Sequence, residues 1–115
     1  MRVLAVLVAV ALSGCSTSIP FALAPDTTVH VKVLGNPGHE CVIEPSSDAH
    51  RQLQSWLAEN RAGWSQLYYT TPNGGILLST SEMYLHLFGD TAYATVPTGI
   101  IAKQVSESEY AFVVC

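Results

Sequence analysis

Basic residues are scarce in this sequence. Its 115 residues include five Lys and Arg, nine Asp and Glu and four His, which gives a formal net charge of −4. The four basic residues after position 14 lie far apart along the chain, at positions 32, 51, 61 and 103. Because nucleic acids and anionic lipid headgroups are bound by clustered Lys and Arg, the sequence argues against both as partners.

Motifs of known catalytic or cofactor chemistry are also missing. The sequence contains no Gly-x-Ser-x-Gly, no His-Glu-x-x-His, no Cys-x-x-Cys and no phosphate-binding glycine loop. Gly74-Gly75 is typical of a turn, and His39 with Cys41 has no third ligand at metal-binding spacing. We therefore predict a protein that is not an enzyme and that needs no cofactor or metal.

A run of apolar residues long enough to cross a bilayer is absent as well. The longest one, Val3 to Leu12, has about ten residues, follows Arg2 and ends in Leu12-Ser13-Gly14-Cys15. This stretch resembles the lipobox of bacterial lipoprotein signal peptides. The resemblance implies a diacylglyceryl group on the Cys15 sulfur, cleavage before Cys15, and acylation of the new amino group.

The resemblance divides the chain into a signal peptide (1–14), a lipidated tether (15–27) and one domain (28–115). Two or three acyl chains of the palmitate type give a stable membrane anchor. Ser16 stands where an Asp would imply retention in an inner membrane, so we expect an outer-membrane lipoprotein facing the periplasm. In a host with one membrane the same leader would place the domain on the cell surface.

Residues 16–27 contain two prolines and no periodic pattern, and predict a tether that reaches about 40 Å when extended. Ile19, Phe21 and Leu23 alternate, and we favour their docking onto the domain over contact with lipid. The two remaining cysteines, Cys41 and Cys115, predict one disulfide in an exported protein. It would close a loop of about 75 residues and stabilise the fold by about 4 kcal/mol.

The domain begins with an alternating strand over residues 28–34 and, after a turn, a short extended segment over 39–44. One helix follows Pro45, with Ser46 or Ser47 as its N-cap and an end near residues 60–63. Its apolar stripe contains Ala49, Leu53, Trp56 and Leu57. The opposite, solvated face is expected to contain His50, Arg51, Gln54 and Glu59.

Strands joined by turns are predicted from Trp64 onward, over residues 64–71, 76–80, 83–88, 91–96, 100–105 and 110–115. Trp56 and Trp64 are expected to anchor the helix to this sheet. The order of elements indicates an α+β fold, in which one amphipathic helix packs on an antiparallel meander of about five to six strands.

Large side chains occupy both sides of residues 83–88. Met83, Leu85 and Leu87 share one side; Tyr84, His86 and Phe88 share the other. One interpretation is a central strand with one side under the helix and the other partly covered by a loop. The other is an exposed aromatic binding face formed by Tyr84, His86 and Phe88.

Small anchored domains without catalytic motifs resemble inhibitors or immunity proteins that neutralise envelope-acting enzymes or toxins. We therefore expect a membrane-anchored, protein-binding module. The first alternative is an assembly accessory of an envelope complex. The second is a small-ligand binder or enzyme, which would require a concave pocket with converging polar groups.

Overall fold

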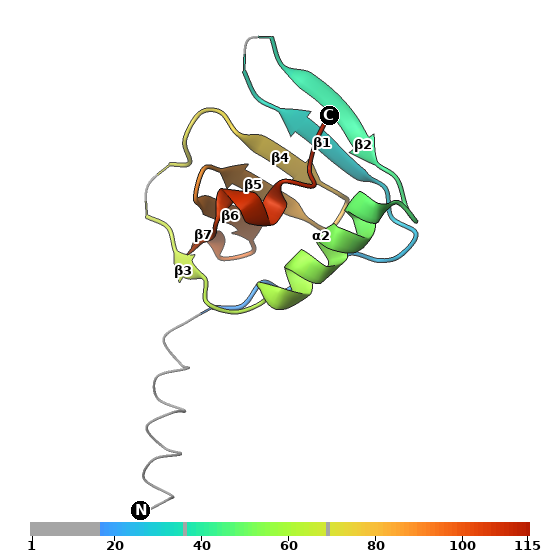
Figure 1. Cartoon of the computed structure of the whole chain (residues 1–115). Coiled ribbons are helices and arrows are strands. Elements are labelled where there is room, and N and C mark those ends of the chain that lie inside the picture. Colours follow the sequence, from blue (N-terminus) through green and yellow to red (C-terminus); the bar gives the residue numbers. More distant parts are fainter. Residues whose placement is uncertain (1–16, 36, 69) are drawn as a thin grey trace, which may run out of the picture.

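The computed structural model describes residues 17–35, 37–68 and 70–115 (Figure 1). The expectations for residues 1–16, including the signal peptide and Cys15, lie outside this part of the chain. Its elements are β1 Val29–Val33, β2 His39–Ile43, α2 Asp48–Glu59, β3 Ser65–Gln66, β4 Ile76–Ser79, β5 Tyr84–Phe88, β6 Thr91–Val96, β7 Gly99–Gln104 and the 3₁₀ helix η1 Glu107–Tyr110. No helix of the described residues is long and apolar enough to cross a membrane.

The strands form one antiparallel sheet in the order β2-β1-β4-β5-β6-β7-β3. The predicted α+β class, with one α-helix on an antiparallel sheet, is confirmed within the described residues. The strand count of five to six is wrong, because the sheet has seven strands. Residues 39–43 pair with β1 along their whole length as a full edge strand, while the predicted strand 64–71 is reduced to Ser65–Gln66.

One face of the sheet is the hydrophobic core. Alternation in the strands turns Val31, Leu78 and Leu85 to this face, and all three are buried. Helix α2 packs Leu53 and Leu57 on them. In Figure 1, α2 and the C-terminal segment both lie in front of the sheet, on this side. Burial against these two elements explains why the inward positions are aliphatic.

Trp56, in the last turn of α2, and Trp64, just before β3, pack against each other, as expected for residues that anchor the helix to the sheet. Trp64 is fully buried and Trp56 nearly so, and their rings meet edge to face with centroids 6.5 Å apart. The Trp64 indole N–H donates to the carbonyl of Asn60 at 2.6 Å, and the Asn60 N–H donates to the carbonyl of Trp56 at 2.9 Å. This arrangement fixes the helix end against the start of β3.

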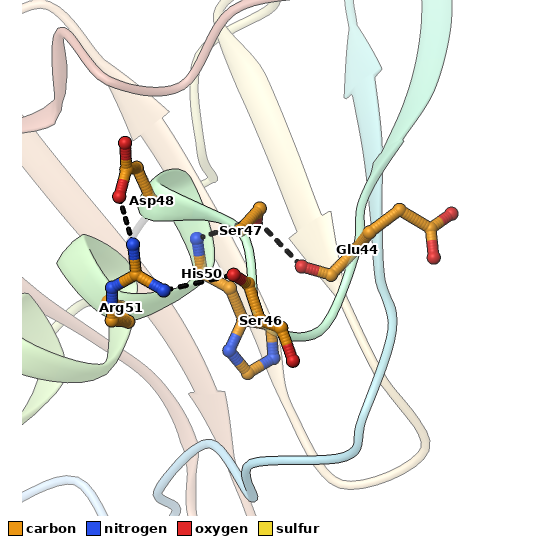
Figure 2. A network of polar contacts seen from close by, with 6 residues as sticks. All are labelled: Glu44, Ser46, Ser47, Asp48, His50 and Arg51. Atoms are coloured by element: carbon orange, nitrogen blue, oxygen red, sulfur yellow. Dashed lines mark hydrogen bonds and ion pairs between the residues drawn. The ribbon is translucent and has the colours of Figure 1, made fainter.

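Helix α2 begins at the predicted cap. The Ser47 hydroxyl accepts a hydrogen bond from the His50 N–H at 3.1 Å and donates to the Glu44 carbonyl at 2.7 Å (Figure 2). Arg51 pairs with Asp48 and also donates to the Ser46 carbonyl at 2.9 Å. The Ser47 hydroxyl thereby satisfies one of the backbone N–H donors that a helix start otherwise leaves free.

The N-terminal segment 17–27, which we call the strap, is packed against the domain. Ile19, Phe21 and Leu23 are buried in the core, so the favoured docking of these alternating residues is confirmed. Thr17 and Trp64 exchange backbone hydrogen bonds of 2.9 and 3.0 Å. The reach of about 40 Å would apply only to an extended segment, and these residues are instead bound to the domain from the first described one.

The strap runs antiparallel along α2. From the helix, His50 Nε2 lies 2.7 Å from the Thr27 carbonyl, and the Gln54 amide donates to the Leu23 carbonyl at 3.0 Å. His50 is buried, so its expected place on a solvated helix face is wrong. The helical pattern of apolar residues predicted that this side of α2 would be exposed, but the strap covers it.

The C-terminal residues cross the core face instead of extending the sheet. The predicted strand 110–115 is wrong, since η1 occupies Glu107–Tyr110 and no strand follows it. The Tyr110 hydroxyl donates to the Gly89 carbonyl at 2.6 Å. Burial raises the pKa of this hydroxyl, with smaller contributions from the Glu107 and Asp90 carboxylates. The predicted disulfide between Cys41 and Cys115 is present, with a Cα–Cα distance of 5.6 Å.

Candidate functional site

The opposite face of the sheet, which we call the open face, lies on the side away from α2. The pairing register places Val42, His30, Ser79 and Tyr84 in one row across β2, β1, β4 and β5. Val42, Tyr84 and Phe88 are exposed by 44, 46 and 41%. These three are the strand residues among the five exposed large hydrophobics of the described chain. The open face therefore presents apolar side chains to solvent.

The three predicted binding residues, Tyr84, His86 and Phe88, differ in their solvent exposure. Tyr84 and Phe88 are exposed as expected, but His86 is buried, at 5% exposure. β5 is the fourth of seven strands, and the loop that precedes β4 covers His86. The prediction that His86 is exposed together with Tyr84 and Phe88 is therefore wrong. The alternative, a central strand partly covered by a loop, is confirmed at His86.

His86 joins that loop to the sheet. Its Nε2 lies 2.7 Å from the Gly74 carbonyl. A carbonyl only accepts, so the Nε2–H of His86 donates this hydrogen bond. The ring also lies beside Tyr93, its cross-strand partner on β6, with centroids 5.5 Å apart. Tyr93 therefore belongs to the open face beside His86.

The covering loop requires glycine at two successive positions. Gly74 and Gly75 have φ angles of 108° and 86°, a region that side chains disfavour. A Cβ on Gly75 would collide with the Leu87 carbonyl. The Gly75 carbonyl accepts from the Leu34 N–H at 2.9 Å, which ties the loop to the end of β1. The turn predicted at Gly74-Gly75 thus holds one wall of the site.

A pocket of about 660 Å³ lies between this loop and the sheet. Its sheet side is formed by Leu77, Tyr84, His86, Tyr93, Thr95 and Ile100. No Asp, Glu, Lys or Arg lines it among the described residues. The pocket thus combines apolar walls with hydroxyl and imidazole groups, which suits a neutral group that donates or accepts hydrogen bonds.

A second hollow of about 500 Å³ adjoins the pocket on the side of β1 and β2. Leu77 and Tyr84 line both spaces and so form the ridge between them. In contrast to the pocket, this hollow contains charged side chains, Lys32 and Glu40, which face each other in the β1–β2 register. The open face is therefore contoured on both sides of Tyr84.

Metal ligands do not converge in the described part of the chain. No group of three or more His, Cys, Asp or Glu side chains there is placed to hold an ion. Cys41 is bonded to Cys115, which removes its thiolate as a partner for His39.

No protein-family model, curated protein or solved structure matches this chain. The assignment of a function therefore depends on the residues of the site.

Proposed function

We propose that this protein is a small envelope lipoprotein, anchored by lipid on Cys15, that binds a protein partner through the open face. The observation that carries the proposal is the contrast between the two sides of the sheet. The strap, α2 and the C-terminal segment cover one side, while Val42, Tyr84 and Phe88 remain exposed on the other. Exposed aromatic side chains beside a pocket are typical of the centre of protein interfaces.

The class of partner follows from the anchor. A lipobox with Ser16 after the lipidated cysteine suits a domain facing the periplasm of an outer membrane. There the partner would be an envelope-acting enzyme or toxin that this chain inhibits, or a complex whose assembly it assists. The contoured ridge at Tyr84 supports the inhibitor role, because a ridge between two hollows fits a partner segment that inserts side chains on both sides.

The experiment is an affinity capture from host envelope extracts with the oxidised, unlipidated chain 16–115. The test variant carries Tyr84→Ala and Phe88→Ala, and the matched control carries Tyr68→Ala, since Tyr68 is 90% exposed but lies in a loop. We expect one stoichiometric partner, retained by the control and bound about 30-fold more weakly by the test variant. A partner bound equally by all three chains would contradict the open face as the binding surface.

A small-ligand binder is the second candidate, and the pocket over His86 favours it. Its volume lies within the range of small-molecule sites, and His86, Tyr93 and Thr95 supply polar groups. If capture yields no partner, NMR spectra recorded with a library of neutral small molecules decide this case. Shifts confined to the pocket residues and lost in His86→Ala would support it, whereas a spectrum without shifts would reject it.

A further inference from the structure

The strap leaves almost no free chain between the anchor and the domain. Thr17 is hydrogen-bonded to Trp64, and only one residue separates it from Cys15. Two residue steps span at most about 7 Å. If Cys15 is lipidated, the end of the domain that holds Thr17 must therefore lie within about 7 Å of the lipidated residue. This inference rests on the anchoring in the proposed function, but not on the protein partner.

We propose that this end of the domain, formed by Thr17, residues 61–66 and Lys103, lies against the headgroups of an anionic membrane. Arg61 and Lys103 are the residues that face the lipid phosphates. The orientation of the whole domain is then fixed, because a domain attached at one end by so short a link cannot turn its far end to the same surface.

Two of the four basic residues after position 14, Arg61 and Lys103, lie at this end although they are far apart in the sequence. Arg61 exchanges hydrogen bonds with Ile19 of the strap: its carbonyl accepts at 2.9 Å and its guanidinium donates at 3.3 Å. Lys103 Nζ donates to the Ala62 carbonyl at 2.9 Å. A Cβ on Gly63 would lie 3.5 Å from Lys103 Cε, so the lysine stem follows the same loop.

Two of the four basic residues after position 14 thus meet where the strap begins. Arg61 is exposed and Lys103 partly so. The nearest acidic residue in sequence, Glu59, is at the end of α2 and lines the hollow between α2 and the C-terminal segment. A basic residue close to an anionic membrane favours binding by about fivefold. Two such residues are a weak attraction on their own, but they are sufficient to orient a domain that lipid already holds.

The opposite end of the domain gives the matched reference. The β1–β2 hairpin projects at the far end from the start of the strap (Figure 1). Its charged residues include Lys32 and Glu40. Arg51 lies at the first turn of α2, paired with Asp48, and therefore also far from the anchor along the helix.

The experiment uses the full chain, processed by its host and inserted into nanodiscs of phosphatidylethanolamine and phosphatidylglycerol. A gadolinium chelate on the lipid headgroups broadens the NMR signals of nearby amides. We expect at least threefold stronger attenuation for residues 61–66 and 103 than for residues 38–40 of the hairpin. Equal attenuation at both ends, or stronger attenuation at the hairpin, would overturn the orientation.

Two double variants test the role of the charges. In the variant with Arg61→Glu and Lys103→Glu, the attenuation of the amide signals of residues 62–66 should fall at least twofold. In the control variant, with Lys32→Glu and Arg51→Glu, this attenuation should equal that of the parent chain. Equal attenuation in both variants would reject the contact of the basic pair with phosphate. Mass spectrometry of the purified chain shows independently whether it carries acyl groups. A chain without acyl groups would overturn both the anchoring and this orientation. Partner capture by the open face is unaffected by any of these results.

Discussion

We expect the strap to contribute much of the free energy of unfolding, because it supplies core residues that precede the expected domain boundary at residue 28. Ile19, Phe21 and Leu23 are exposed by only 1, 7 and 8%. We predict that a chain starting at residue 28, oxidised and without lipid, is largely unfolded under conditions in which the chain 17–115 is folded.

The size of the effect follows from burial. Each of the three side chains contributes about 1.5–3 kcal/mol when fully buried, so their loss removes about 4.5–9 kcal/mol, an upper estimate because unfolded chains bury some surface. The hydrogen bonds from His50, Gln54 and Arg61 to the strap add about 1 kcal/mol each. A domain of this length is typically stable by about 5–15 kcal/mol. The deletion therefore removes most or all of the stability.

Urea unfolding followed by circular dichroism measures this difference. The point variant Phe21→Ala should lose about 3–5 kcal/mol, while the control Ala22→Ser, at the exposed neighbouring position, should change stability by less than about 0.5 kcal/mol. A chain 28–115 that unfolds cooperatively, with a free energy within about 2 kcal/mol of the chain 17–115, would refute the role of the strap.

Three further predictions use the same unfolding assay. Replacing Cys41 and Cys115 with Ser, which opens a link across 74 positions, should cost about 4 kcal/mol, and a loss below about 1 kcal/mol would contradict the chain-entropy estimate. Gly75→Ala should cost about 3 kcal/mol or more because its Cβ meets a backbone carbonyl, while Gly89→Ala, with open space around it, should cost about 1–2 kcal/mol; equal losses would contradict the collision. The raised pKa of Tyr110 keeps its proton bound longer in the folded state than in the unfolded state, so stability should fall as pH rises above about 10. Tyr110→Phe should lose about 1 kcal/mol at neutral pH and show a smaller alkaline decline, and an unchanged decline would contradict the assignment.

The helix and the strands β4 to β7 follow from local sequence. Ser47 supplies the cap, and tight turns at Gly89-Asp90 and Pro97-Thr98-Gly99 separate short alternating segments. Local signals of this kind decide where elements begin and end. They also place Tyr84 and Phe88 on one side of their strand, but they do not decide whether that side is exposed, and they do not identify Val42 as part of the same face.

The wrong predictions concern contacts between distant segments. His50 is buried by the strap, and His86 by a loop whose position the alternation within β5 does not encode. The aromatic and β-branched residues within 110–115 are typical of a strand, but the disulfide links Cys115 across the core face to Cys41 in β2. That path is incompatible with continuing from β7 as a further strand, because β2 and β7 are five positions apart in the sheet order.

The central claim, that the partner binds the open face, is tested most directly by photocrosslinking in living host cells. A photoreactive amino acid would replace Tyr84 on the open face, Tyr68 in the exposed loop, or Gln52 on the outer side of α2. We predict one discrete adduct of higher mass from position 84 and none from the two other positions. An adduct from position 52, with none from position 84, would contradict it.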